Sequence, residues 1–170
     1  MGYHTDFYGQ FDVTPVLSED HKNYLVRFSE TRRMKRDPDR LPSDPIREQA
    51  DLPPGFEGAY FVGGLGYCGQ DSDSSVIQSN IQPKGQPGLW CQWIPNEDGT
   101  AIVWDEGEKF YEYVEWIEYL MKHFFTPWGY ALSGKVRWQG QDPDDRGMIK
   151  ITDNIVQAET DKMTNSLNEE

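Results

Sequence analysis

The spacing of hydrophobic and polar residues changes along the chain, and each spacing predicts an element. Residues 3–13 alternate around two phenylalanines, a pattern typical of a strand with one buried face. The Thr14-Pro15 pair that follows predicts a turn. Ser18 stands where a helix N-cap is expected, and the apolar residues after it predict a helix that runs to about Met34.

The middle of the chain has weaker patterns. Residues 35–58 hold five prolines and many charges without a recognisable period, which indicates a surface connection. Residues 59–62 predict a short buried strand, and residues 63–75 form a long loop rich in glycine, serine and aspartate. Loops of this length in compact domains are often functional.

The strongest patterns lie in the second half. Strand-like runs at 89–94 and 101–104 flank Asp98-Gly99, a good signal for a β-hairpin. Between 110 and 124, apolar residues recur every three or four positions, which predicts a helix with one wide apolar stripe. We expect the Thr-Pro-Trp-Gly sequence at 126–129 to end that helix.

Alternation at 132–138 and again at 148–151 predicts a C-terminal hairpin, and the residues after it are polar. The fold class expected from this order is α+β, with a mainly antiparallel sheet and two principal helices packed against it. We expect a single domain over residues 1–158 and a polar C-terminal tail over residues 159–170.

Composition supports a folded chain with a very polar surface. Hydrophobic residues make up 36% of the sequence and aromatic residues 14%, while the mean hydropathy is −0.76. No apolar stretch is long enough for a membrane span, so we expect a cytoplasmic protein without membrane association. Cys68 and Cys91 lack the spacing of a disulfide framework or a zinc site, so we expect reduced thiols, Cys91 on a buried strand.

The net charge of −13 is unevenly distributed. Residues 1–50 carry eight basic and nine acidic side chains, whereas residues 51–170 carry eight basic and twenty acidic ones. A negative field of this kind repels nucleic acid and anionic membranes. We therefore expect a protein partner with a basic surface and no direct nucleic-acid binding, and the oligomeric state stays open.

The glycine-rich loop is one candidate ligand or partner site. Its candidate residues are Gly64, Gly66, Cys68, Gln70, Asp71 and Asp73. The spelling G-x-G-x-x-G matches a dinucleotide site, but no helix opening follows it, so no dinucleotide is expected. The two aspartates have the spacing of a calcium loop, a spacing more typical of an ordinary turn. We expect no metal and no cofactor.

An acidic face on the second predicted helix is another candidate site. It consists of Glu108, Glu112, Glu115 and Glu118, spaced by about 6 Å per turn. That spacing is close to the phosphate spacing of a nucleic-acid strand, so the face could mimic nucleic acid, although a solvated helix face is the more usual explanation. Asp105 is expected to cap this helix.

A basic cluster follows the first predicted helix. Arg32, Arg33, Lys35 and Arg36 would complement the negative end of the helix dipole or contact an anion. Trp116 and Tyr119 lie off the main apolar stripe of the second helix, and together they would mark a binding patch if both were exposed.

Four sequence segments carry a resemblance. They are Met1-Gly2-Tyr3 with Thr5 and Phe7, the basic run at 32–36, Gly-Gln-Pro-Gly-Leu-Trp-Cys-Gln-Trp at 85–93, and Gly-Glu-Lys-Phe-Tyr at 107–111. In these segments the chain resembles a family of uncharacterised proteins found in bacteria and their phages. The resemblance implies no catalytic residue, cofactor or partner.

Two functions follow from these patterns. The first is a non-enzymatic acidic interaction factor, such as an inhibitor or accessory protein of a phage or mobile element, that binds a basic partner surface or mimics nucleic acid. The alternative is a small enzyme or ligand-binding domain that uses the 63–75 loop. The three histidines are scattered, and no catalytic signature decides whether the protein is an enzyme.

Overall fold

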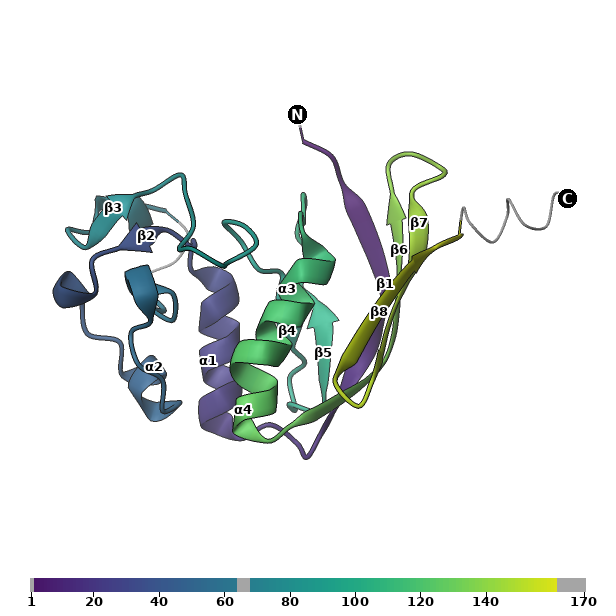
Figure 1. Ribbon diagram of the computed structural model, residues 1–170, viewed down its shortest axis with the longest axis horizontal. Coiled ribbons are helices and arrows are strands. Elements are labelled where there is room, and N and C mark those ends of the chain that lie inside the picture. The colour runs from purple at the N-terminus through teal and green to yellow at the C-terminus, as the bar shows by residue number, and fades with distance from the viewer. Residues whose placement is uncertain (1, 64–67, 162–170) are drawn as a thin grey trace, which may run out of the picture. The chain divides into compact units, whose positions relative to one another are not determined.

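The computed structural model describes residues 2–63 and 68–161, and its contacts divide the chain into two compact units (Figure 1). We call Met1–Leu17 together with Gln92–Glu170 the sheet unit, and Ser18–Cys91 the central unit. The expectation of one domain ending at residue 158 stays a prediction.

An antiparallel sheet organises the sheet unit, which confirms the α+β class expected from the sequence. Its six strands lie in the order β4-β5-β1-β6-β7-β8. In chain order they are β1 (Thr5–Thr14), β4 (Trp93–Pro95), β5 (Ala101–Trp104), β6 (Ala131–Gly140), β7 (Arg146–Thr152) and β8 (Ile155–Thr160). Pairing of β4 with β5 confirms the predicted hairpin, and Gly99 in its turn has a φ of 75°.

The central strand β1 is paired very differently on its two sides. Against β6 it forms a continuous register from Thr5↔Gly140 to Thr14↔Ala131. Against β5 it pairs only at Phe11↔Ile102 and Asp12↔Ala101. The first half of β1 therefore has a strand neighbour on one side only.

The helical segment of the sheet unit begins later than expected. It runs through α3 (Tyr113–Leu120), the wide π-helical turn η4 (Met121–Phe125) and α4 (Thr126–Trp128). The segment ends within 126–129 as expected, but not at Pro127, because the helical backbone continues from Phe125 through Trp128. Gly129, with a φ of 92°, ends the segment.

The helix α3 lies against one face of the sheet (Figure 1), and aromatic side chains form the core between them. The ring of Phe7 lies 4.9 Å from Tyr113 and 5.3 Å from Trp93, measured between centroids. Trp93 donates its indole N–H to the carbonyl of Tyr113 over 2.8 Å, so its one polar group is satisfied. Burying each such side chain contributes about 1.5–3 kcal/mol before entropy is subtracted.

The central unit is built around α1 (Glu19–Glu30), whose N-cap is Ser18 as expected. The Ser18 hydroxyl accepts from the backbone N–H of His21 over 3.2 Å. The unit also contains β2 (Lys35–Arg36), η1 (Pro38–Arg40), α2 (Pro45–Gln49), η2 (Phe56–Gly58), η3 (Gln70–Ser72) and β3 (Val76–Gln78), with β2 and β3 paired antiparallel. No helix in either unit, across the described residues, combines the length and apolar character needed to cross a bilayer.

Four expectations for residues of the central unit are wrong. The first helix ends at Glu30 rather than Met34, because Thr31 has an extended backbone conformation. Residues 35–58 are not only a surface connection, since they contain α2 and the buried side chain of Asp44. Residues 59–62 are mostly buried but form no strand, and Cys91 is buried as expected but precedes the strand that begins at Trp93.

Candidate functional site

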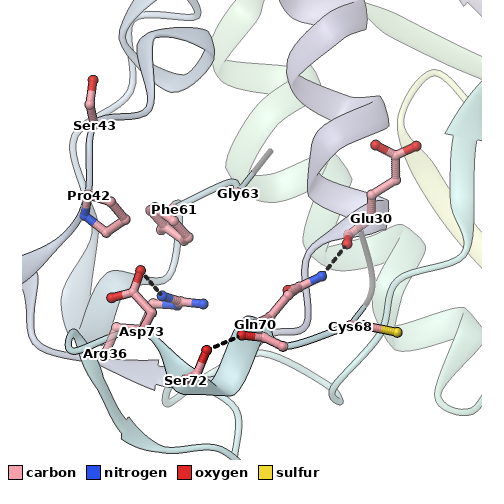
Figure 2. Close-up of a pocket in the computed structure, with 11 residues that line it drawn as sticks. Glu30, Arg36, Pro42, Ser43, Phe61, Gly63, Cys68, Gln70, Ser72 and Asp73 are labelled. Carbon is pink, nitrogen blue, oxygen red and sulfur yellow. Dashed lines mark hydrogen bonds and ion pairs between the residues drawn. The ribbon is translucent and has the colours of Figure 1, made fainter. Parts of the chain in front are cut away.

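A cavity of about 530 Å³ lies within the central unit (Figure 2). Its volume is in the range typical of small-molecule sites. The residues that line it are Glu30, Arg36, Pro42, Ser43, Phe61, Gly63, Cys68, Gly69, Gln70, Ser72 and Asp73. The cavity thus brings together the predicted glycine-rich loop and one member of the predicted basic cluster.

The end of α1 fixes the two rims of the cavity. The Gln70 side chain donates to the carbonyl of Glu30 over 2.9 Å and accepts from the backbone N–H of Arg32 over 2.8 Å. Across from it, the backbone N–H of Gly63 donates to the hydroxyl of Thr31 over 3.0 Å. The bond to Glu30 satisfies a carbonyl that the last turn of a helix leaves open, and the three bonds together tie Gln70 and Gly63 to the end of α1.

Arg36 provides a buried positive charge in the cavity wall. Its side chain is 3% exposed, and its Nη1 donates to the hydroxyl of Ser75 over 2.8 Å. The nearest carboxylate oxygen, Oδ2 of Asp73, is 3.9 Å away, which is too far for a hydrogen bond. The guanidinium carbon lies 4.3 Å from the centroid of the Phe61 ring (Figure 2).

The charge of Arg36 is only partly compensated. Burial, with a smaller contribution from Arg33, lowers the pKa of Arg36 to about 10, although Asp73 acts in the opposite direction. The guanidinium therefore stays charged at neutral pH. Among the described residues, Ser75 is its one hydrogen-bond partner, whereas a buried guanidinium normally has several. An anion inside the cavity would complete this coordination.

The other basic residues of the cluster have structural contacts. Arg33 is 2% exposed and donates from Nη2 to the carbonyls of Ala59 and Phe61, over 2.9 and 2.7 Å. Arg32 donates to the carbonyl of Ser79 over 2.9 Å, and Lys35 forms an ion pair with Glu57 at 3.6 Å. None of the cluster lies in the last turn of α1, so the idea that it complements the helix dipole is wrong.

The predicted loop residues divide between the cavity and its surroundings. Cys68, Gln70 and Asp73 line the cavity, whereas Asp71 lines a smaller neighbouring depression. Gly64 and Gly66 lie outside the described residues. Sequence reasoning missed the wall formed by Pro42, Ser43 and Phe61, because nothing in the local pattern of residues 35–62 places it opposite the loop.

Asp73 of the loop makes a hydrogen bond within the protein itself. Oδ1 of Asp73 accepts from the backbone N–H of Ser75 over 2.7 Å, as in an Asx turn. Within 2–63 and 68–161, no three or more histidine, cysteine, aspartate or glutamate side chains are grouped so as to hold a metal ion.

The acidic candidate face is less regular than the sequence suggested. Glu115 and Glu118 are exposed on α3, and Glu112 stands at its N-cap position with a φ of 56°. Glu108 is exposed but precedes the helix, so the expected row of four along one helix is wrong. Trp116 and Tyr119 are buried, at 0% and 8% exposure, and they form no exposed aromatic patch.

Asp105 does not cap α3 as expected, because the helix begins eight residues later, at Tyr113. Instead its Oδ1 accepts from the backbone N–H of Gly107 over 2.8 Å, in the link that follows β5. Burial raises the pKa of this carboxyl, and the hydrogen bond from Gly107 partly offsets that effect.

The two units differ in charge. The sheet unit carries eighteen acidic and seven basic residues in the sequence, and the central unit carries eleven and nine. The excess negative charge therefore belongs to the sheet unit.

Comparison with known proteins yields no match to a protein-family model, a curated protein or a solved structure. We therefore infer function from the geometry of the two units.

Proposed function

We propose that the central unit binds a small molecule that carries an anionic group, a carboxylate or a phosphate, at Arg36. The observation that carries this proposal is the position of the guanidinium, which is buried in a cavity wall with one hydrogen bond, to Ser75, and one long ion pair, to Asp73 at 3.9 Å. This is the ligand-binding alternative of the sequence analysis, with Arg36 in place of the aspartates as the recognition residue.

The shape of the cavity suits a ligand with two parts. Guanidinium donors match the oxygens of carboxylates and phosphates in pairs, so Arg36 would hold the charged end. Phe61 and Pro42 offer apolar surface for the remainder of the ligand. The hydroxyls of Ser43 and Ser72 come from opposite walls of the cavity and would add polar contacts, that of Ser72 as an acceptor because it already donates to the carbonyl of Gly69.

The proposal is tested with three probes of similar size: benzoate, phenyl phosphate and neutral benzamide. Binding is followed through the amide resonances of residues 68–73 in the full chain. We expect one or both anions to shift these resonances saturably and benzamide to leave them unchanged. In the variant Arg36→Met, anion affinity should fall at least about tenfold, the effect of losing a charged hydrogen bond.

Arg40→Met is the matched control. Arg40 belongs to the same unit, is 69% exposed and does not line the cavity, so its loss changes the net charge equally without touching the site. Equal weakening by Arg40→Met and Arg36→Met would show a diffuse charge effect and overturn the proposal. Absence of saturable anion binding in the wild type would also overturn it.

A second proposed function belongs to the sheet unit. We propose that it is a non-enzymatic interaction surface for a basic partner, as the charge asymmetry first suggested. The excess of acidic over basic residues in this unit, with Glu115 and Glu118 exposed on α3, supports the proposal. Phage or mobile-element origin and mimicry of nucleic acid remain part of this proposal.

This second function is tested by affinity capture from a bacterial lysate at about 0.05 and 0.5 M salt, which changes the screening length several-fold. A specific partner should be retained at low salt, released at high salt, and lost with Glu115→Lys/Glu118→Lys. Capture that is independent of salt and of these substitutions would contradict the proposal.

A further inference from the structure

β1 and β5 separate after two residue pairs, and a groove opens where they part. The groove has a volume of about 760 Å³, and its lining includes Asp6, Phe7 and Gly9 from β1, Trp104 from β5, and Glu106 and Glu108 from the link that follows. All of these residues belong to the sheet unit. We call it the β1–β5 groove.

One wall of the groove is the open edge of a strand. The backbone N–H of Val13 donates to the carbonyl of Thr100, so odd-numbered residues of β1 direct their backbone polar groups toward β5. Backbone groups alternate sides along a strand, and the β1–β6 register is continuous over this stretch. Phe7 and Gly9 therefore direct their N–H and C=O groups into the groove, where β5 no longer pairs with them.

The opposite wall is held in position. The backbone carbonyl of Gln92 accepts from the N–H of Asp105 over 3.0 Å. The side chain of Gln92 donates to the carbonyl of Glu108 over 2.8 Å. The same side chain accepts from the indole N–H of Trp104 over 3.2 Å. The groove is thus a formed feature with a polar strand edge on one side and an aromatic, acidic rim on the other.

The charges around the groove select its occupant. Glu106 and Glu108 are exposed, and within the described residues neither forms an ion pair. A second copy of this chain would bring a unit with the same excess of negative charge. Nucleic acid would be repelled for the same reason.

We infer that the β1–β5 groove binds an extended peptide segment of a partner protein by β-strand addition, with lysine or arginine at alternate positions facing Glu106 and Glu108, since Asp6 already pairs with His4 at 2.8 Å. Main-chain hydrogen bonds to Phe7 and Gly9 would supply affinity, and the carboxylates would select for basic side chains. Trp104 would cover the aliphatic stem of one of them. This inference rests on the second proposed function only in that the partner is basic, and it gives the sheet unit a peptide site separate from Glu115 and Glu118.

The test uses a labelled peptide of about eight residues in which lysine alternates with threonine. We expect salt-sensitive binding to the full chain, together with slower hydrogen exchange at the amides of Phe7 and Gly9. A peptide of the same sequence, N-methylated at alternate residues, cannot extend a sheet and should bind at least about tenfold more weakly. Equal binding of the two peptides would overturn strand addition.

A pair of matched double variants separates this site from the acidic helix. Glu106→Gln/Glu108→Gln should weaken peptide binding roughly fivefold, as expected for two exposed charge pairs, and Glu115→Gln/Glu118→Gln should leave it unchanged. If only Glu115→Gln/Glu118→Gln weakens binding, the groove is not the peptide site, but the proposal of a basic partner is retained. If no peptide binds but capture of a partner still depends on Glu115 and Glu118, the same conclusion follows.

Discussion

Asp44 receives the guanidinium of Arg47 on both carboxylate oxygens, with Nε lying 3.0 Å from Oδ1 and 2.8 Å from Oδ2. The two side chains are 3% and 11% exposed, so this is a buried ion pair. Arg47 also donates to the carbonyl of Leu52, and Asp44 accepts from the backbone N–H of Val62 over 3.4 Å. The pair therefore joins α2 to the segment that carries Phe61 into the cavity wall.

Removing one partner of this pair should be costly. Asp44→Ala leaves the Arg47 charge buried without its carboxylate, and we expect the free energy of unfolding to fall by about 3–5 kcal/mol in urea titrations. The double variant Asp44→Ala/Arg47→Met should recover part of that loss. As a control, Glu19→Ala breaks the exposed pair with Lys22 and should cost less than about 1 kcal/mol. Similar losses for the two single variants would contradict the role given to Asp44.

Arg36 should behave in the opposite way, because its charge is buried with little compensation. Arg36→Met removes the charge and keeps an unbranched apolar side chain beside Phe61. We expect the ligand-free protein to be as stable as the wild type or more stable, because the desolvation cost of the buried charge is removed and Asp73, left without its partner, is 29% exposed and can be solvated. Ser75→Ala removes the one hydrogen-bond partner and should destabilise by about 1–3 kcal/mol. A large loss of stability in Arg36→Met would assign Arg36 to the fold rather than to a ligand.

Substitution of Gly134 tests how closely β1 and β6 pack, and Gly129, which also has a positive φ, is the control. At Gly134, φ is 145° and an added Cβ would lie 2.5 Å from the carbonyl oxygen of Gln10 on β1. At Gly129, φ is 92° but nothing lies within 4 Å of the added atom. Gly129→Ala should therefore cost about 1–2 kcal/mol from backbone strain alone, and Gly134→Ala should cost about 2–3 kcal/mol more because β1 and β6 must separate. Equal losses in thermal unfolding would show that the strands tolerate the contact.

The sequence predicted those elements in which one face is buried and the other exposed. Residues 3–13 and 132–138 alternate, and they form β1 and β6. The last strand, β8, was missed because its residues are exposed or half-buried and show no alternation. A usable signal was present in Asp153 and Asn154, whose φ values of 46° and 67° make the tight turn between β7 and β8.

The candidate site was predicted in pieces. The loop carrying Gln70 and Asp73 and the cluster carrying Arg36 were each recognised from composition. Their meeting depends on tertiary contacts between Arg33 and the 59–61 carbonyls, and between Gln70 and the end of α1. Contacts between residues distant in the chain leave no trace in the spacing of hydrophobic residues, so the wall formed by Phe61 could not be placed from the sequence.

The pH dependence of stability should include a contribution from His123. Its ring stacks on Tyr119 with centroids 4.1 Å apart, and burial, with a smaller effect of Lys122, lowers its pKa below the ordinary 6.5. When burial lowers the pKa of a histidine in the folded state, its contribution to stability is fully present at pH values above its pKa in the unfolded chain. As pH falls below that value, the unfolded chain takes up the proton first, so the free energy of unfolding decreases toward the folded pKa.

His123→Phe keeps an aromatic ring against Tyr119 but has no proton to bind. We expect its free energy of unfolding, measured in urea at about pH 7 and pH 5, to fall less than that of the wild type over this interval. Part of the acid sensitivity should persist, because burial also lowers the pKa of His21 and gives a contribution of the same sign. His21→Gln should remove that part separately. If His123→Phe loses as much stability as the wild type between the two pH values, His123 takes up its proton equally in the folded and unfolded states.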